Sequence, residues 1–129
     1  MPPETTAPSA DAGRVAVRRI DDTILAIGLD RPAKRNGFTP EMAGQLAQAY
    51  TELERDPALR VGLLYAEGGH FTGGLDLPRW AESMKAGHTV WGGERIDPLD
   101  LREPRRTKPV VVAVQGVCYT LGINSMPSV

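Results

Sequence analysis

The chain has 129 residues, which is enough for one domain of ordinary size but hardly for two. Its net charge of −1 gives no global attraction to nucleic acid or anionic lipid, so neither is expected as a partner. A single cysteine, Cys118, excludes an internal disulfide framework and a cysteine-based zinc site. No apolar stretch approaches the roughly 18 residues of a membrane span, and a cytoplasmic location without a membrane partner is the expectation.

Strands are expected soon after the N-terminus. Residues 1–12 are rich in Pro, Ala, Ser and Thr, with no basic region before an apolar run, which predicts a disordered leader rather than a signal peptide. Alternating apolar residues then predict strands at 14–20 and 23–29, joined as a hairpin through Asp21-Asp22. The folded domain is expected to cover residues 13–129.

A helix and a third strand follow. Thr39 offers a hydroxyl cap and Pro40 suits the first helical position, so a helix is predicted from there to just before Pro57. The apolar run 61–66 predicts a buried strand. Residues 67–74 contain four glycines and are expected to be irregular.

The later part of the chain alternates between helix, loop and strand signals. Pro78 is expected to open a helix that places Trp80 and Met84 together in the core. Residues 88–104 are Gly-rich and charged, which predicts a mobile surface segment. The β-branched run Val110–Val114 predicts a strand buried on both faces. Strands separated by helical crossovers indicate an α/β layered fold with at least partly parallel pairing.

Two glycine turns stand where predicted strands end. The first is the segment 69–77, and the second follows the last strand at Gln115-Gly116. Open α/β sheets bind ligands at the carboxyl ends of their strands, and glycines let backbone N–H groups approach a ligand closely. Two such exits side by side would aim two N–H donors at one carbonyl oxygen, which suits an enolate-forming thioester site. Taken alone, the first turn is better explained as a purely structural loop, since turns dominate glycine usage.

An ordered set of motifs carries a family resemblance. Arg31-Pro32 with Asn36 comes first, and Lys108-Pro109 with its apolar strand and Gly116 comes last. Between them lies the run Gly69-His70-Phe71-Thr72-Gly73-Gly74-Leu75-Asp76-Leu77. The chain resembles the N-terminal half of a crotonase-superfamily domain, the enoyl-CoA hydratase/isomerase family, over residues 15–123. The resemblance implies an α/β fold with a crotonase-like ββα spiral core, here truncated, and an acyl-CoA thioester as substrate.

The resemblance also implies which residues form the site. The backbone N–H groups of Leu75 and Leu121 take the positions of the oxyanion hole. No separate cofactor is implied, because coenzyme A is part of the substrate. Two histidines without clustered acids give no metal site. Substrate and coenzyme A contacts are implied at these positions: Lys34, Arg35, Gly73, Gly74, Leu75, Asp76, Leu77 and Gly122.

Some of these residues have simpler interpretations. A solvated basic loop explains Lys34 and Arg35 as well as contacts to coenzyme A do. Asp76 stands just before Pro78, which favours a helix cap over a catalytic acid. Asn124 occupies the position of one hydratase glutamate, and an amide has no proton chemistry near neutral pH. The second hydratase glutamate falls beyond Val129.

The expected function is therefore a hydratase-type lyase of fatty acid metabolism, acting on 2-enoyl-CoA thioesters through a backbone oxyanion hole. Two alternatives stay open. One is other enolate chemistry on acyl-CoA, such as isomerisation or thioester hydrolysis. The other is a non-catalytic fragment that binds acyl-CoA or another subunit. Full-length relatives imply homotrimers or hexamers.

Overall fold

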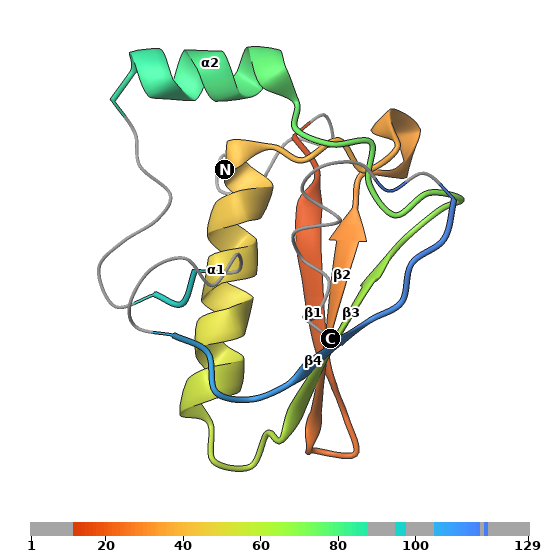
Figure 1. Ribbon diagram of the computed structural model, residues 1–129, viewed down its shortest axis with the longest axis vertical. Coiled ribbons are helices and arrows are strands. Elements are labelled where there is room, and N and C mark those ends of the chain that lie inside the picture. The colour runs from red at the N-terminus through yellow and green to blue at the C-terminus, as the bar shows by residue number, and fades with distance from the viewer. Residues whose placement is uncertain (1–11, 88–94, 98–104, 117, 119–129) are drawn as a thin grey trace, which may run out of the picture.

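The computed structural model describes residues 12–87, 95–97, 105–116 and 118. It is an α/β structure in which a four-stranded sheet packs against one long helix, while a shorter helix lies across the N-terminal end of the long one (Figure 1). The elements are β1 (Arg14–Ile20), β2 (Ile24–Asp30), the short 3-10 helix η2 (Pro32–Lys34), α1 (Pro40–Arg55), β3 (Val61–Ala66), α2 (Leu77–Lys85) and β4 (Val110–Val112).

The sheet has the strand order β1-β2-β3-β4. The predicted hairpin is confirmed, because β1 and β2 pair antiparallel through a turn in which Asp21 and Asp22 both have positive φ. The predicted parallel pairing is also confirmed, since β2 pairs with β3 and β3 with β4 in parallel. The carboxyl ends of β2, β3 and β4 consequently lie at one edge of the sheet.

Helix α1 begins and packs as its sequence predicts. The Thr39 side chain accepts a hydrogen bond from the Met42 N–H at 3.1 Å, and Pro40 occupies the first turn. One face of α1 then packs on one face of the sheet, and this contact forms the core. The most deeply buried residues of this contact are Leu25, Ile27, Met42, Leu46, Tyr50, Leu53, Leu59 and Leu64.

The strand predicted over Val110–Val114 is confirmed at Val110–Val112, but the prediction is wrong in its length and in its burial on both faces. The strand ends at Val112, and Val111 and Val114 are 56% and 40% exposed. Only the face of β4 that turns toward α1 is covered, where Val110 is buried. Because β4 is the last strand in the sheet order, no described residue pairs with its outer edge or shields its outward face.

The prediction for α2 is confirmed in position and wrong in packing. The helix begins at Leu77 with Pro78 in its first turn, yet none of its residues is buried and Met84 is 72% exposed. Trp80 alone packs partly against the core, because α2 lies over one end of α1 rather than along it (Figure 1). No helix among the described residues combines the length and the apolar composition that a membrane crossing requires.

The predicted mobile surface segment 88–104 is described only at residues 95–97. There the prediction is wrong, since Ile96 is 3% exposed and belongs to the core. Its N–H donates to the Thr51 hydroxyl of α1 at 2.9 Å. A buried apolar side chain and a backbone hydrogen bond hold this part of the connection against α1.

Candidate functional site

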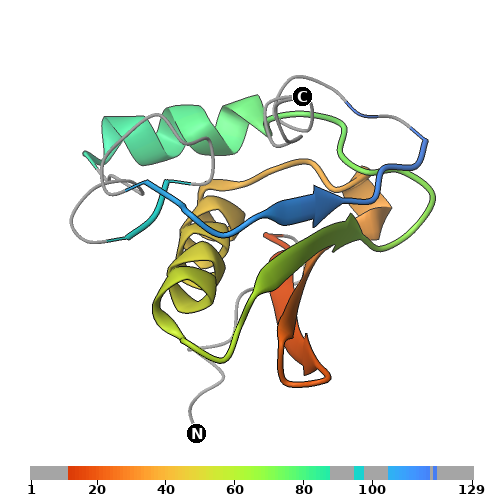
Figure 2. The ribbon, with the colours of Figure 1, turned by 60° about the horizontal axis from the view of Figure 1, so that its bottom comes forward.

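Three loops meet at the carboxyl edge of the sheet, one after each of β2, β3 and β4. Figure 2 shows η2 and the chain leaving β3 and β4 on the same side of the molecule. The Phe71 N–H of the second loop donates to the Gln115 carbonyl of the third at 2.7 Å. The Gln115 side-chain amide returns to the second loop, donating to the carbonyls of Ala66 and Gly68 at 2.9 and 3.1 Å. The two strand exits therefore lie side by side.

Gly116 has no room for a side chain at this junction. Its φ is +59°, and a Cβ there would lie 2.2 Å from the Gly69 carbonyl oxygen. Only glycine avoids both the strain and the collision. The glycine after the last strand is thus required by close packing of the two exits.

Asn36 ties the loop after β2 to the loop after β3. It is fully buried, and its side-chain oxygen accepts the Arg31 N–H at 2.6 Å. Its side-chain amide donates to the carbonyls of Glu67 and His70 at 2.8 and 2.9 Å. Asn36 and its neighbour Arg35 both adopt positive φ, near +50°, a conformation that asparagine tolerates better than most residues. From the sequence, Asn36 was identified only as part of the family resemblance, and its role as a buried cross-link was not predicted.

The backbone N–H groups of residues 73–76 have different partners. The Gly73 N–H donates to the Arg35 carbonyl at 2.7 Å. The Asp76 N–H donates to the Phe38 carbonyl at 2.8 Å, and the Gly74 N–H donates to the Thr72 hydroxyl at 3.1 Å. Within the described residues, the N–H of Leu75 has no acceptor.

The direction of the Leu75 N–H follows from the peptide unit that carries it. The Gly74 carbonyl belongs to the same unit and accepts the Phe38 N–H at 2.8 Å. Because the C=O and N–H of a trans peptide point in opposite directions, the Leu75 N–H points away from Phe38. This donor is fixed in direction before any ligand arrives.

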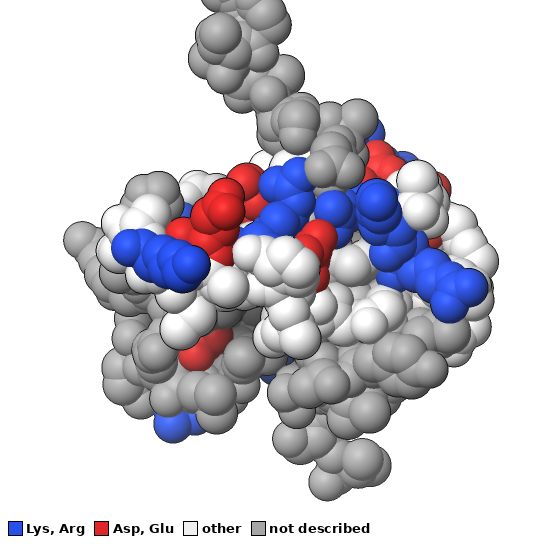
Figure 3. Space-filling view, turned by 90° about the horizontal axis from the view of Figure 1, so that it is seen from above, with Lys and Arg blue, Asp and Glu red and all other residues white. Residues whose placement is uncertain are grey.

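A cavity of about 320 Å³ lies beside the backbone of residues 73–76. Its wall holds three cationic side chains and one carboxylate, so its charge favours an anionic ligand. Figure 3 shows Lys and Arg side chains gathered on the face seen from above, with acidic groups among them. The lining residues are Arg31, Lys34, Arg35, Gly37, Gly73, Gly74, Leu75 and Asp76.

Most of the predicted site residues that the structure describes line this cavity. Leu77 is the exception, since it begins α2 outside the cavity wall and is 66% exposed. Lys34 and Arg35 are both exposed at the rim, which fits either a solvated loop or contacts to a ligand. Leu121, Gly122 and Asn124 lie outside the described residues.

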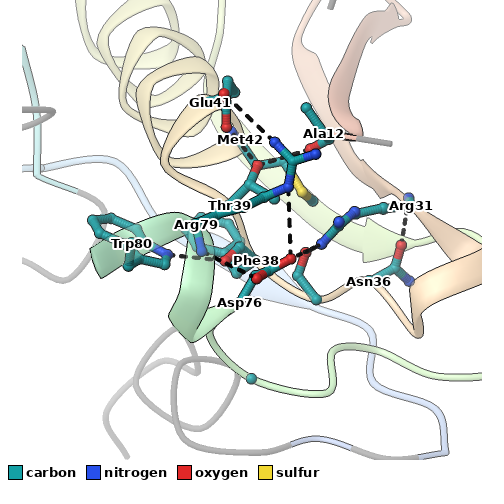
Figure 4. Close-up of polar contacts among 12 residues, drawn as sticks. Ala12, Arg31, Asn36, Phe38, Thr39, Glu41, Met42, Asp76, Arg79 and Trp80 are labelled. Atoms are coloured by element: carbon teal, nitrogen blue, oxygen red, sulfur yellow. Dashed lines mark hydrogen bonds and ion pairs between the residues drawn. The ribbon is translucent and has the colours of Figure 1, made fainter. Parts of the chain in front are cut away.

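Asp76 is a helix cap and half of an ion pair. Its carboxylate accepts the Arg79 N–H at 3.4 Å as the N-cap of α2, which confirms the capping prediction. The guanidinium of Arg31, with a side chain only 3% exposed, donates to the Asp76 carboxylate at 2.8 Å and to the Gly37 carbonyl at 2.9 Å (Figure 4). Burial raises the pKa of Asp76, but the hydrogen bonds from Arg31 and Arg79 outweigh it and lower this pKa below its ordinary value. The carboxylate is thus ionised and already engaged.

The buried position of Arg31 was not predicted, because arginine in a basic loop normally faces solvent. Cys118 was expected to be a small buried hydrophobe, and it packs partly against the core. Burial raises the pKa of its thiol, which keeps it protonated near neutral pH. The described residues that line the cavity therefore offer one preset backbone donor and a cationic wall, and their one carboxylate, Asp76, is already engaged.

A family model described as enoyl-CoA hydratase/isomerase matches residues 19–126. The chain belongs to this family. It is 37% identical over 97 residues to the enoyl-CoA hydratase EchA19 of Mycobacterium tuberculosis, a match that covers 71% of this chain and 35% of that protein. It is 33% identical over 109 residues to the 1,2-epoxyphenylacetyl-CoA isomerase of Escherichia coli, covering 80% of this chain and 40% of the isomerase.

Solved structures of the enoyl-CoA hydratase/isomerase family share the fold. The crystal structure of a probable enoyl-CoA hydratase/isomerase from Mycobacterium abscessus matches with a TM-score of 0.77 and 42% identity. The match covers 86% of this chain and 42% of that one. The chain thus spans less than half the length of these relatives. The resemblance to the N-terminal half of a crotonase-type domain, drawn from the sequence motifs, is confirmed.

Proposed function

We propose that the chain binds an acyl-CoA thioester and directs the Leu75 N–H at the thioester carbonyl oxygen. One observation carries this proposal: among the four N–H groups of residues 73–76, only that of Leu75 lacks an acceptor within the described residues, and Leu75 lines the cationic cavity. A donor fixed in advance stabilises the charge that develops on the oxygen as an enolate forms. Relatives named for enoyl-CoA and epoxyphenylacetyl-CoA support this class of substrate.

The rim of the cavity suits the other end of the ligand. Lys34 and Arg35 stand exposed beside the buried guanidinium of Arg31, and phosphate groups are recognised by such cations. The second carbonyl donor is proposed to be the N–H of Leu121, followed by Gly122, as the resemblance implies. Both residues, and assembly into trimers, stay predictions.

The reaction proposed first is hydration of a 2-enoyl-CoA, with isomerisation or thioester hydrolysis as alternatives. Each passes through negative charge on the thioester oxygen, so each draws on the same backbone donor. Proton transfer needs a further group. Asp76 is the one carboxylate among the described cavity residues, and it is held by Arg31 and the N-terminus of α2.

That engagement favours a second candidate, acyl-CoA binding without turnover. A carboxylate with a lowered pKa that caps a helix is a poor general base. Asn124, at the position of a hydratase glutamate, adds no proton chemistry. On this alternative the chain would polarise the thioester carbonyl and leave the substrate unchanged.

Titration with crotonyl-CoA in a calorimeter tests the proposal, with hydration followed by loss of the enoyl absorbance. The decisive variants are Leu75→Pro and Leu75→Ala. Proline removes the N–H, and the Phe38 bridge survives because it uses the Gly74 carbonyl and the Asp76 N–H instead. We expect Leu75→Pro to weaken binding about tenfold and Leu75→Ala, which keeps the N–H, to bind like the unsubstituted chain.

Four results are possible, and each decides between the proposals. Binding with turnover that Leu75→Pro lowers by about 10²-fold or more supports the enzyme. Binding without turnover supports the non-catalytic candidate. If Leu75→Pro and Leu75→Ala bound crotonyl-CoA equally well, the Leu75 N–H would not contact the ligand. If the unsubstituted chain did not bind crotonyl-CoA, the proposed function as a whole would be contradicted.

A further inference from the structure

Thr72 lies at the centre of the three loops without lining the cavity. It is 1% exposed and forms a parallel bridge with Cys118 of the loop after β4. Its hydroxyl donates to the Asn36 carbonyl at 2.7 Å and accepts the Gly74 N–H at 3.1 Å. The single proton of the hydroxyl and one lone pair are thus both committed to backbone groups.

These contacts hold Gly74 from two sides. Thr72 fixes the N–H of Gly74, and the Phe38 N–H fixes its carbonyl at 2.8 Å. Gly74 has a φ of +100°, and without a Cβ it rotates more freely than any other residue. The two hydrogen bonds thus restrain the peptide units on both sides of Gly74, one of which is the Gly74–Leu75 unit.

The orientation of that peptide unit decides where the Leu75 N–H points, because the unit is planar. The Thr72 hydroxyl therefore accepts the N–H of the residue directly before Leu75, whose own N–H is the proposed donor to the thioester carbonyl. Its other partner, Asn36, is the residue that cross-links the loops after β2 and β3. The hydroxyl oxygen of Thr72 thus connects Asn36 to the backbone segment that carries the Leu75 N–H.

We propose that Thr72 is a positioning residue, whose hydroxyl holds Gly74 so that the Leu75 N–H is aimed at the thioester carbonyl. This inference rests on the proposed function and adds the side chain that sets its geometry. Thr72 is absent from the cavity wall, so it acts through Gly74 and not on the ligand. The alternative is that its methyl group only fills space between the loops.

Two matched variants separate the hydroxyl from the methyl group. Thr72→Val keeps the shape and removes the hydroxyl, leaving the Gly74 N–H and the Asn36 carbonyl without their partner. Thr72→Ser keeps the hydroxyl and removes the methyl group. A packing role predicts more damage from serine, whereas a positioning role predicts more damage from valine.

The readout is a ratio of affinities for two probes that cannot be hydrated. Butyryl-CoA carries the thioester carbonyl, and S-butyl-CoA is the thioether with a methylene in its place. Their affinity ratio therefore measures the hydrogen bonds to the carbonyl, and general loosening of the loops affects both probes alike. We expect Thr72→Val to lower the ratio roughly fivefold and Thr72→Ser to leave it unchanged.

The inference is overturned if Thr72→Val keeps the ratio, or if Thr72→Ser lowers it as much. Should Thr72→Val fail to fold, as judged by circular dichroism, Thr72→Ala removes the same hydroxyl without adding bulk, and the same criterion applies. A wild-type chain that does not prefer butyryl-CoA contradicts the proposed function instead. In that case the amide resonance of Leu75 still tests whether the Thr72 hydroxyl orients the Leu75 N–H. A shift of this resonance in Thr72→Val but not in Thr72→Ser supports that role, and equal shifts in both variants reject it.

Discussion

The two helices begin alike and are held in different ways. Each starts with a polar cap and an early proline, Thr39 with Pro40 in α1 and Asp76 with Pro78 in α2. Helix α1 then buries one whole face against the sheet, whereas α2 buries none of its residues. The same start signal therefore says nothing about what stabilises the helix afterwards.

The position of α2 depends on polar contacts at its first turns. Asp76 is bound to Arg31 through its side chain and to the Phe38 carbonyl through its N–H. The Trp80 indole N–H donates to the same Phe38 carbonyl at 2.9 Å (Figure 4). All these contacts lie beside Leu75. Apolar burial thus stabilises the scaffold, and a few hydrogen bonds at the site hold α2 in place.

The largest effect is expected in the scaffold. Leu53 of α1 is fully buried, and Leu53→Ala leaves a cavity that costs about 3 kcal/mol of the free energy of unfolding. Urea denaturation measures this loss. Met84→Ala in α2 is the matched control, because Met84 is 72% exposed and should lose almost nothing. A similar loss in both variants would mean that α2 is packed as tightly as α1.

An intermediate effect is expected at the ion pair. Asp76→Asn keeps a good cap for α2, since asparagine is itself a favoured N-cap, and removes the charge facing Arg31. The buried guanidinium then loses the carboxylate that it contacts at 2.8 Å, at a cost of about 2 kcal/mol in the free energy of unfolding near neutral pH. Urea denaturation again measures it.

The same variant carries a pH prediction. The folded pKa of Asp76 is lowered, so its contribution to stability is fully present above the unfolded value of about 3.9 and is lost as pH falls through the lower folded value. The stability difference between wild type and Asp76→Asn should therefore be constant near neutral pH and disappear in strong acid. Using the difference cancels Glu54 and Asp56, whose pKa values are also lowered. A difference that persists in strong acid would show that charge is not its source.

The sequence predicted what local signals decide. The caps of both helices, the hairpin at Asp21-Asp22 and the strand 61–66 follow from neighbouring residues, and all are confirmed. Burial was harder to predict, because it depends on what lies across from a residue. Val111 and Met84 are exposed because no described residue covers them, and Ile96 is buried because it lies against α1.

The site, too, could be predicted from the sequence only where local signals were enough. Glycine spacing at the strand exits was enough to single out residues 73–76 as a place where the backbone could meet a ligand. The side chains that hold this backbone could not be found from spacing. Arg31 and Asp76 are 45 positions apart, and the Thr72 hydroxyl reaches a carbonyl 36 positions away. Such contacts follow from the fold and leave no periodic pattern in the sequence.

The smallest effect, and the sharpest test of the comparison between the helices, is expected from Trp80→Phe. Phenylalanine keeps an aromatic ring against the core and loses the indole N–H that reaches Phe38. The bond contributes about 1 kcal/mol, and its loss should be felt locally, because α2 has no buried face to share it. Amide hydrogen exchange should then quicken roughly fivefold in α2 and stay unchanged in α1. If protection fell equally in both helices, Trp80 would belong to the scaffold, and the division between a helix held by burial and a helix held by the site would be wrong.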